Sequence, residues 1–484
     1  MKRVFIFLLL MVFSYVNSQS QIGQDIDGET SNDSFGQSVS LSSDASVLAV
    51  GGYKNSDNGS WSGHVRVFQN VGGNWVQLGQ DIDGDAANDQ LGYSVSLNSN
   101  GNILAVGAFG GGFSSLSYVK VYQNQSGNWL QIGNTVFAED LGDNFGNSVA
   151  LNRSGTILAV GAPGNNNSNG TNSGHVRVYE NQNGNWAQIG SDINGDGVSD
   201  RFGHSVRLNG NGSVLAVGAI QNFEPGYVKV FENQGGNWVQ LGSSIAGETA
   251  GDDCGFSVDI SSNGTVLAVA SENANSNNGH VRVYEYLSNI WTQIGSNIDS
   301  EGVGDAFGHS LSLNDNGNVL AVGAQGNDGN GSFSGHARVF ENQGGSWVQI
   351  GNDIDGEASA DFSGRSVSLS GDGFALAIGA PFNDGLNGVD SGHVRVYDLK
   401  EILSTNNDVT LHDFKLYPNP VTNEFVIQLQ EGKTFDEIKI YNTLGRLVLA
   451  SKSLTVNVEE LPSGVYIVKI FSKEKNSSVK LIVQ

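Results

Sequence analysis

The sequence predicts an all-β protein, namely a seven-bladed β-propeller followed by a small Ig-like β-sandwich. Two observations lead to this prediction: a unit that recurs seven times between residues 19 and 397, and a change of composition near residue 400. The phrase Gln-[Ile/Leu]-Gly marks the repeat and starts at positions 21, 77, 131, 188, 240, 293 and 349. Radial repetition of short strands at such a period is typical of β-propellers.

Each unit contains four short segments in a constant order, exemplified by residues 36–41, 48–51, 65–68 and 75–79. They read Gly-x-Ser-[Val/Leu]-x-[Leu/Ile], Leu-Ala-[Val/Ile]-[Gly/Ala], a Val-Arg-Val-Tyr type and Trp-x-Gln-[Ile/Leu]-Gly. All four are β-branched or alternating and are bounded by Gly, Asn, Asp and Ser, which indicates strands. We therefore expect four antiparallel strands in each blade.

The two ends of the repeat region indicate that the ring closes on itself. The Trp segment follows the first six units and is missing after the seventh. Residues 19–23 contain the matching Gln-Ile-Gly, with Gln19 in place of the Trp. We expect this N-terminal segment to complete the last blade and so remove both free sheet edges.

The chain ends differ in character from the repeats. Lys2 and Arg3 precede a short apolar run, and residues 1–18 read as a secretory signal peptide. Residues 19–397 hold 12 Lys and Arg against 38 Asp and Glu, whereas residues 398–484 hold 10 against 11. This shift predicts a linker over 398–410 and a separate domain over 411–484 of about seven short strands.

The repeats resemble a known family. Phe35-Gly36, Phe145-Gly146 and Phe202-Gly203, together with Gly161-Ala162-Pro163, look like FG-GAP repeats, which form the seven-bladed propeller of integrin α subunits. The resemblance covers 19–397 and implies a propeller fold. It implies surface recognition only loosely, because propellers host many functions.

The C-terminal segment resembles a second family. Tyr417-Pro418-Asn419-Pro420, Tyr441-Asn442 with Gly445, and Leu461-Pro462-Ser463-Gly464 followed by Tyr466 look like the type A C-terminal sorting domain of type IX secretion cargo. The resemblance implies that this protein is exported by the type IX machinery, that residues 411–484 are removed, and that the product is secreted or held at the outer cell surface.

Several function classes are excluded or disfavoured by composition. A formal charge of −25 argues against nucleic acid as a partner, because phosphate binding needs a basic face. A single cysteine, Cys254, allows no intrachain disulfide. No later run is apolar enough for a transmembrane segment. We expect a monomer.

No catalytic constellation is readable in the sequence. The Ser of Gly-x-Ser is never followed by x-Gly, so the motif is not a nucleophile elbow. Five of the eight histidines occupy one repeat position, where Tyr118 and Tyr227 stand in the other two units. A residue that is exchanged for Tyr in this way is expected to be a packed, hydrogen-bonding aromatic side chain rather than a ligand or general base. The repeated Arg or Lys two residues later is expected to pair with the acids of the blade.

Binding is expected on the face that carries the long loops. In an up-down blade, the loops after the second and the fourth strand emerge at the same end, and loops on a rigid scaffold carry recognition. The variable residue of Gly-x-Ser lies near that rim. The rim candidates are Tyr93, His204, His309 and Arg365.

One acidic loop has the spacing of a cation site. Asp192, Asn194, Asp196 and Asp200 place oxygen ligands at positions 1, 3, 5 and 9 of a loop with Gly at position 6, which suits Ca²⁺. The alternative is a solvated acidic turn whose last Asp makes an Asx-type hydrogen bond to the next strand. Ca²⁺ is thus the one cofactor candidate, and no other cofactor is indicated.

These features predict a non-catalytic secreted or cell-surface binding or adhesion protein that recognises an extracellular protein or glycan through the long-loop face. One alternative is an extracellular hydrolase or lyase, for which His204, His309 and Arg365 are the candidates at the channel mouth. The other is a structural matrix protein without a discrete ligand.

Overall fold

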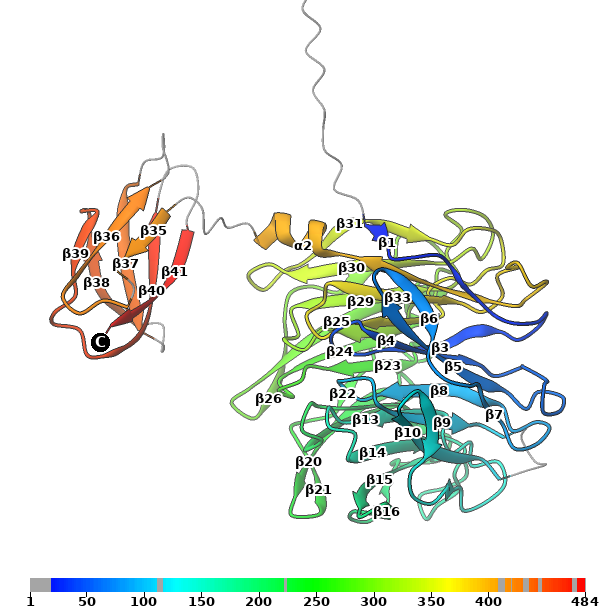
Figure 1. The fold of residues 1–484 in the computed structure, drawn as a ribbon. Coiled ribbons are helices and arrows are strands. Elements are labelled where there is room, and N and C mark those ends of the chain that lie inside the picture. Colours follow the sequence, from blue (N-terminus) through cyan, green and yellow to red (C-terminus); the bar gives the residue numbers. More distant parts are fainter. Residues whose placement is uncertain are drawn as a thin grey trace, which may run out of the picture. The chain divides into compact units, whose positions relative to one another are not determined.

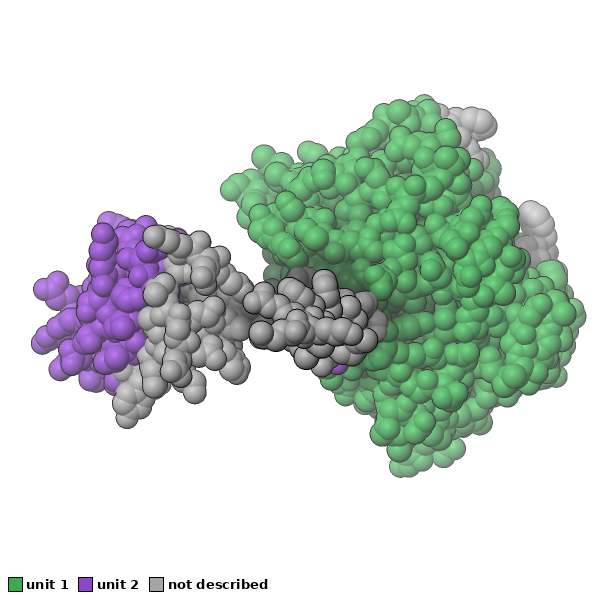
Figure 2. All heavy atoms as spheres, turned by 90° about the horizontal axis from the view of Figure 1, so that it is seen from above, with its two compact units in different colours: residues 1–400 green, residues 401–484 purple. Residues whose placement is uncertain are grey.

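The structure is a computed structural model, and it describes residues 19–110, 116–221, 224–407, 414–418, 420–429, 435–442, 446–471 and 477–483. The chain divides into two compact units, residues 1–400 and 401–484, coloured separately in Figure 2. The predicted signal peptide, residues 1–18, lies outside the described residues and stays a prediction. Among the described residues, no helix has the length and apolarity required to cross a bilayer.

The first unit consists of seven antiparallel sheets that resemble the blades of a propeller (Figure 1). The innermost strands are β3 (Phe35–Leu41), β8 (Leu91–Leu97), β13 (Ser148–Leu151), β18 (Phe202–Leu208), β23 (Cys254–Ile260), β28 (Phe307–Leu313) and β32 (Ser366–Leu369). The second strands are β4 (Val47–Gly52), β9 (Ile103–Ala108), β14 (Ile157–Ala162), β19 (Val214–Ala219), β24 (Val266–Ser271), β29 (Val319–Ala324) and β33 (Ala375–Ala380).

The two outer strands of each blade follow. The third strands are β5 (His64–Val71), β10 (Tyr118–Gln125), β15 (His175–Gln182), β20 (Tyr227–Gln234), β25 (His280–Leu287), β30 (His336–Asn342) and β34 (His393–Asp398). The fourth strands are β6 (Asn74–Gln77), β11 (Asn128–Gln131), β16 (Asn185–Gln188), β21 (Asn237–Gln240), β26 (Ile290–Gln293), β31 (Trp347–Asp355) and β1 (Ser20–Gln21). The four predicted strands per repeat are therefore confirmed.

A two-residue strand then pairs again with the third strand in most blades. These strands are β2 (Ile26–Asp27), β7 (Ile82–Asp83), β12 (Val136–Phe137), β17 (Ile193–Asn194), β22 (Ile245–Ala246) and β27 (Ile298–Asp299), and in blade 6 the long β31 does the same. A short helix, α1 (Ala274–Asn277), lies in the loop before β25. Blades are numbered below by their innermost strands, from β3 in blade 1 to β32 in blade 7.

The predicted closure by the N-terminal segment is confirmed. Strand β1 pairs antiparallel with β34, with Ser20 opposite Asp398, and β2 pairs with the same strand, with Asp27 opposite His393. The blue β1 accordingly lies among the yellow strands of the last repeats in Figure 1. The last blade is thus built from both ends of the repeat region.

The cores lie between neighbouring blades. Phe35, Phe145, Phe202 and Phe307 of the Phe-Gly motifs are completely buried, each packed against the strands of the preceding blade. Cys254 fills the same position in blade 5 and is also buried. Indole Nε1 atoms add links between blades: Trp75 donates to the Ile22 carbonyl at 3.1 Å, and Trp129 donates to that of Leu78 at 2.9 Å. The carbonyl of the middle residue of Gln-[Ile/Leu]-Gly accepts from the Trp of the next unit in the same way for Trp186, Trp238 and Trp291, whereas the buried Nε1 of Trp347 has no hydrogen-bond partner.

The sequence predicts a linker over 398–410, but residues 400–407 form a helix, α2 (Lys400–Asn407). Leu399, Ile402 and Leu403 are buried, and the Leu399 amide donates to the Phe374 carbonyl at 2.8 Å. Apolar residues at this helical spacing explain the difference from a linker.

The second unit has two sheets that share one core. One contains β35 (Phe414–Tyr417), β36 (Glu424–Leu429) and β39 (Thr455–Asn457). The other contains β38 (Leu447–Ser451), β37 (Glu437–Asn442), β40 (Gly464–Phe471) and β41 (Ser477–Val483). Alternation along β40 buries Tyr466, Val468 and Ile470, which is the pattern of a strand with one face on a core.

Candidate functional site

The Gly-x-Ser motif lies at the start of each innermost strand. The glycines adopt positive φ, for example 89° at Gly203, and β3, β8, β18, β23 and β28 have an irregular register at this point. Only glycine adopts this conformation without strain, and such bulges redirect the side chain that follows. The motif therefore orients residue x separately from the rest of the strand.

The serine of the motif joins each blade to the next. Its hydroxyl donates to the carbonyl of the Gly in the following blade at 2.6–2.9 Å: Ser38 to Gly92, Ser94 to Gly146, Ser148 to Gly203, Ser205 to Gly255, Ser257 to Gly308, Ser310 to Gly364 and Ser366 to Gly36. These seven bonds form a closed circle. The serines thus have a structural role, as expected from the missing nucleophile pattern.

The variable residues of Gly-x-Ser gather at one end of the central channel. Arg365 acts electrostatically on Tyr93, on His204 and on His309, although these side chains come from four different blades. The rings of His204 and His309 both lie 4.9 Å from that of Phe256, centroid to centroid. The structure therefore brings all four rim candidates together.

A second set of side chains, which the sequence reasoning missed, joins them. These residues directly follow the second strands: Tyr53 after β4, Phe109 after β9, Glu272 after β24 and Gln325 after β29. The residue types differ at this position although the preceding Leu-Ala-[Val/Ile] is nearly constant. Comparing the seven repeats with one another would have revealed this second variable position.

Polar contacts connect the two sets. The Nδ1 atom of His309 lies 2.6 Å from Glu272 Oε1 and 2.9 Å from Gln325 Nε2, and Arg365 donates to Gln325 Oε1 at 2.9 Å. The side chains of His309 and Glu272 are more than nine-tenths buried. Burial lowers the pKa of His309, and it lowers the pKa of His204 to about 4.

Aromatic rings extend this group across blades 6, 7, 1 and 2. Ring centroids lie 5.6 Å apart for Phe333 and Phe362, 5.2 Å for Phe362 and Phe382, 5.7 Å for Tyr53 and Tyr93, and 4.5 Å for Tyr93 and Phe109. The Nζ atom of Lys54 lies between the rings of blades 6 and 7 and those of blades 1 and 2. It is 4.9 Å from the Phe382 centroid and 5.3 Å from that of Tyr53. We call these residues, with His204, Phe256, Glu272, His309, Gln325 and Arg365, the mouth cluster.

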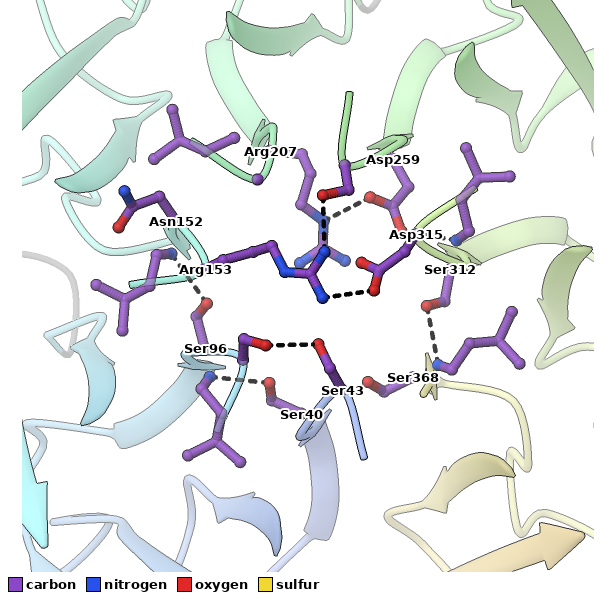
Figure 3. Close-up of a pocket in the computed structure, with 18 of the residues that line it drawn as sticks. Ser40, Ser43, Ser96, Asn152, Arg153, Arg207, Asp259, Ser312, Asp315 and Ser368 are labelled. Carbon is purple, nitrogen blue, oxygen red and sulfur yellow. Dashed lines mark hydrogen bonds and ion pairs between the residues drawn. The ribbon is translucent and has the colours of Figure 1, made fainter. Parts of the chain in front are cut away.

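The opposite end of the channel is a small polar pocket of about 140 Å³ (Figure 3). Arg153 extends across it to Asp315 at 2.8 Å, and Arg207 Nε lies 2.9 Å from Asp259. Backbone amides also close a circle here: Ser43 donates to Ser99, Ser99 to Arg153, Arg153 to Gly210, Gly210 to Ser262, Ser262 to Asp315, Asp315 to Gly371 and Gly371 to Ser43. Because its charges are already paired, this end serves ring closure better than ligand binding.

The repeated histidines are buried, as expected for packed side chains, but the expected hydrogen bonding is not borne out. Buried ring nitrogens without a hydrogen-bond partner are both nitrogens of His64 and His280 and the Nε2 atoms of His175, His336 and His393. His64, His175, His280, His336 and His393 are at most 1% exposed. The repeated cations pair with acids, as predicted: Arg177 contacts Glu139 and Asp192, and Lys120 contacts Asp85 at 2.6 Å. In the two blades with Tyr, the phenol donates to a buried aspartate instead, Tyr118 to Asp89 and Tyr227 to Asp200, each at 2.8 Å.

The residues of the predicted calcium loop face different partners. Both carboxylate oxygens of Asp192 accept from Arg177 at 2.9 Å, and those of Asp196 accept from Lys229 at 2.6 Å. Asp200 accepts from the amides of Asp196 and Gly197 at 2.8 Å, and Asn194 lies in β17. These contacts fit an acidic turn and give the Ca²⁺ prediction no support. The expected bond to the next strand is not what the structure shows, because Asp200 is buried and accepts from amides that precede it in the loop.

Three other groups combine acids with a buried histidine. Within each group, one ligand atom per residue lies within 4.8 Å of the others: Glu29, Asp57 and His64; Glu139, His175 and Asp192; and Asp25, Glu357 and His393. Imidazole together with carboxylates suits zinc and similar divalent ions. Among the described residues, these are the groups that could hold a metal.

Comparisons with known proteins agree with both resemblances. The model of the secretion system C-terminal sorting domain matches residues 415–484, and that of the FG-GAP repeat matches residues 26–68, 139–179 and 353–397. No curated protein gives a match.

Two solved structures are distantly similar to this chain. A periplasmic gluconolactonase of Pseudomonas aeruginosa is 16% identical with a TM-score of 0.47, over 66% of this chain and 85% of its own. A putative 6-phosphogluconolactonase of Bacteroides uniformis is 13% identical with a TM-score of 0.46, over 67% and 86%. Likeness of this degree supports no inference about activity. What the family models do establish is that the chain carries FG-GAP repeats, ends in a type IX secretion sorting domain, and is therefore a secreted or outer-surface protein.

Proposed function

We propose that this exported protein is a non-catalytic binding protein that recognises an extracellular ligand, a glycan or a protein, through the mouth cluster. The observation that supports the proposal is the concentration of non-repeating side chains at one end of an otherwise repetitive ring. Elsewhere the seven blades repeat the same residues for the same structural roles. A ligand-specific surface needs residues that differ from blade to blade.

The composition of the mouth cluster favours a glycan. Sugars have apolar faces and hydroxyl groups, and they suit sites where aromatic rings lie beside hydrogen-bonding groups. Tyr53, Tyr93 and Phe109 offer such rings, and Gln325 and Arg365 offer amide and guanidinium groups beside them. Phe333, about half exposed at the outer end of the aromatic series, extends the surface that a longer oligosaccharide could cover.

A glycan array with the purified protein tests this proposal. We expect Tyr93→Ala to weaken binding to any glycan that the protein retains by tenfold or more, about 1.4 kcal/mol, because the Tyr93 ring joins the aromatic surface by stacking on Phe109 and meeting Tyr53 edge to face. Phe137→Ala is the matched control, since Phe137 is an exposed aromatic on β12 away from the mouth cluster. Equal losses in both variants would contradict the proposal, and binding to a protein but to no glycan would assign the surface to a protein ligand.

One observation favours a second candidate, an extracellular hydrolase or lyase. His309 and Glu272 form a buried imidazole–carboxylate pair at 2.6 Å beside Arg365, an arrangement that can orient a general base. If this candidate holds, the protein cleaves a polysaccharide or peptide offered to it, and Glu272→Gln abolishes cleavage while ligand binding persists. If the unmodified protein, with His309 and Glu272 in place, binds ligand but releases no product, it is a binding protein only.

A further inference from the structure

The closing blade has a strongly acidic cavity at the start of its third strand, β34. Its volume is about 480 Å³, and it is bounded by the N-terminal segment, the loop before β32 and the loop before β34. The ionisable side chains that line it are Asp25, Asp27, Glu357, Asp361, Asp384 and His393. Five carboxyl groups thus surround one imidazole, so the cavity attracts a cation.

His393 is directed at the acids of this cavity. The residue is 1% exposed, its Nδ1 atom lies 3.9 Å from Glu357 Oε2, and its Nε2 atom has no hydrogen-bond partner. Asp25, Glu357 and His393 each offer one ligand atom within 4.8 Å of the other two. Ligands held at ~2.0–2.2 Å from one ion lie up to ~4.4 Å apart, so small side-chain rotations suffice for shared coordination.

The equivalent groups in other blades are already neutralised by arginine. Arg177 contacts both Glu139 and Asp192 in blade 3, and Arg338 contacts both Glu301 and Asp353 in blade 6.

In blade 7 the arginine is turned away. Arg395 donates to the Asp355 carbonyl at 2.6 Å and approaches only Glu357, at 3.6 Å. Asp25 has no cationic partner among the described residues, and its hydrogen bond comes from the uncharged Gln21 at 2.6 Å. This group therefore differs from those of blades 3 and 6 in lacking a cation that contacts both of its acids.

We propose that Asp25, Glu357 and His393 bind one divalent transition-metal ion, of which Zn²⁺ is the best fit. An imidazole ligand favours Zn²⁺ over Ca²⁺ and Mg²⁺, which prefer all-oxygen sites. The three ligands come from the segment between β1 and β2, from the loop after β31 and from β34. The ion would therefore join the N-terminal segment to the two ends of the last blade, and its role is to hold the ring closed.

Equilibrium dialysis of the tag-free full chain against Zn²⁺ tests the site. We expect one tightly bound Zn²⁺ per chain, and an amide exchange rate over residues 20–27 that falls tenfold or more when Zn²⁺ is added and recovers with EDTA. Glu357→Gln and Asp25→Asn should each weaken Zn²⁺ binding at least tenfold. Glu301→Gln, the same position in blade 6, is the matched control and should leave binding unchanged.

The other outcomes overturn the proposal. If Ca²⁺ or Mg²⁺ protects residues 20–27 as well as Zn²⁺ at equal ionic strength, the cavity is only an acidic surface that any cation screens. If Glu301→Gln weakens Zn²⁺ binding as much as Glu357→Gln, or if several ions bind with equal affinity, the site in blade 7 is not distinct. Because glycan binding involves none of these ligands, its success or failure is independent of this result.

Discussion

Deleting residues 19–27 is expected to destabilise the ring by more than about 3 kcal/mol and to cause aggregation. The deletion removes β1 and β2, so β34 becomes a free edge that can pair with another chain. It also removes the buried Ile26 and the carbonyl of Ile22 that accepts from Trp75. Loss of a buried Ile side chain alone costs ~2–5 kcal/mol. Thermal unfolding and size-exclusion chromatography measure both effects.

A truncation after Asn407 is the control for this experiment. It removes the sheets of the second unit but leaves all seven blades, so the melting temperature of the ring should not change. If the 19–27 deletion also unfolds at the temperature of the intact protein and stays monomeric, the N-terminal segment does not close the ring. The pairing of β1 and β2 with β34 would then contribute little to stability.

The fold was predictable from the sequence because each repeated residue has the same structural role in every blade, so the repeat pattern reveals the strands. The missing Trp segment after the last repeat and the extra Gln-Ile-Gly at residues 21–23 were sufficient to predict closure, since a sheet edge left open on each side is unfavourable. What the sequence could not reveal is the bond that each motif makes. Ser38 reaches the Gly92 carbonyl 54 residues away, a contact that depends on the spacing of neighbouring blades.

The candidate site was only half predictable, for a related reason. Tyr93, His204, His309 and Arg365 stand out because they vary inside a constant motif. Glu272 follows a constant segment and resembles one more acid in a chain with 49 Asp and Glu. Only the structure shows that Glu272 is buried against His309, while Asp192 and Asp196, which have cation-loop spacing, face Arg177 and Lys229.

The second large effect is expected from acid. Burial lowers the pKa of His64, His175, His280, His309 and His336, and lowers those of His204 and His393 to about 4. An unfolded His has a pKa of ~6.5, so stability is complete above that pH and falls as the pH drops toward 4, because only the unfolded chain takes up the proton. For His204 alone the full loss is about 3 kcal/mol.

Buried carboxyl groups act in the opposite direction. Burial raises the pKa of Asp27 and Glu357, so the folded chain takes up these protons first and gains stability as the pH falls. Carboxyl groups start from pKa values near ~4, and their contribution therefore begins at lower pH than that of the histidines. Between pH 7.5 and 5.5 we expect the histidines to dominate and the melting temperature to fall.

Replacing one histidine with tyrosine, the residue at the equivalent position in blades 2 and 4, isolates the contribution of a buried histidine to acid instability. His175→Tyr copies those blades, where Tyr118 and Tyr227 donate to Asp89 and Asp200, and Asp143 is the matching acceptor in blade 3. We expect His175→Tyr to leave the melting temperature unchanged at pH 7.5 and to reduce its fall at pH 5.5. In free energy of unfolding, removing one titrating histidine is worth up to ~1.4 kcal/mol per pH unit. The reverse change, Tyr227→His, should make the melting temperature fall more steeply with pH. If the unmodified protein, His175→Tyr and Tyr227→His all have the same pH profile, burial of these histidines does not control acid stability.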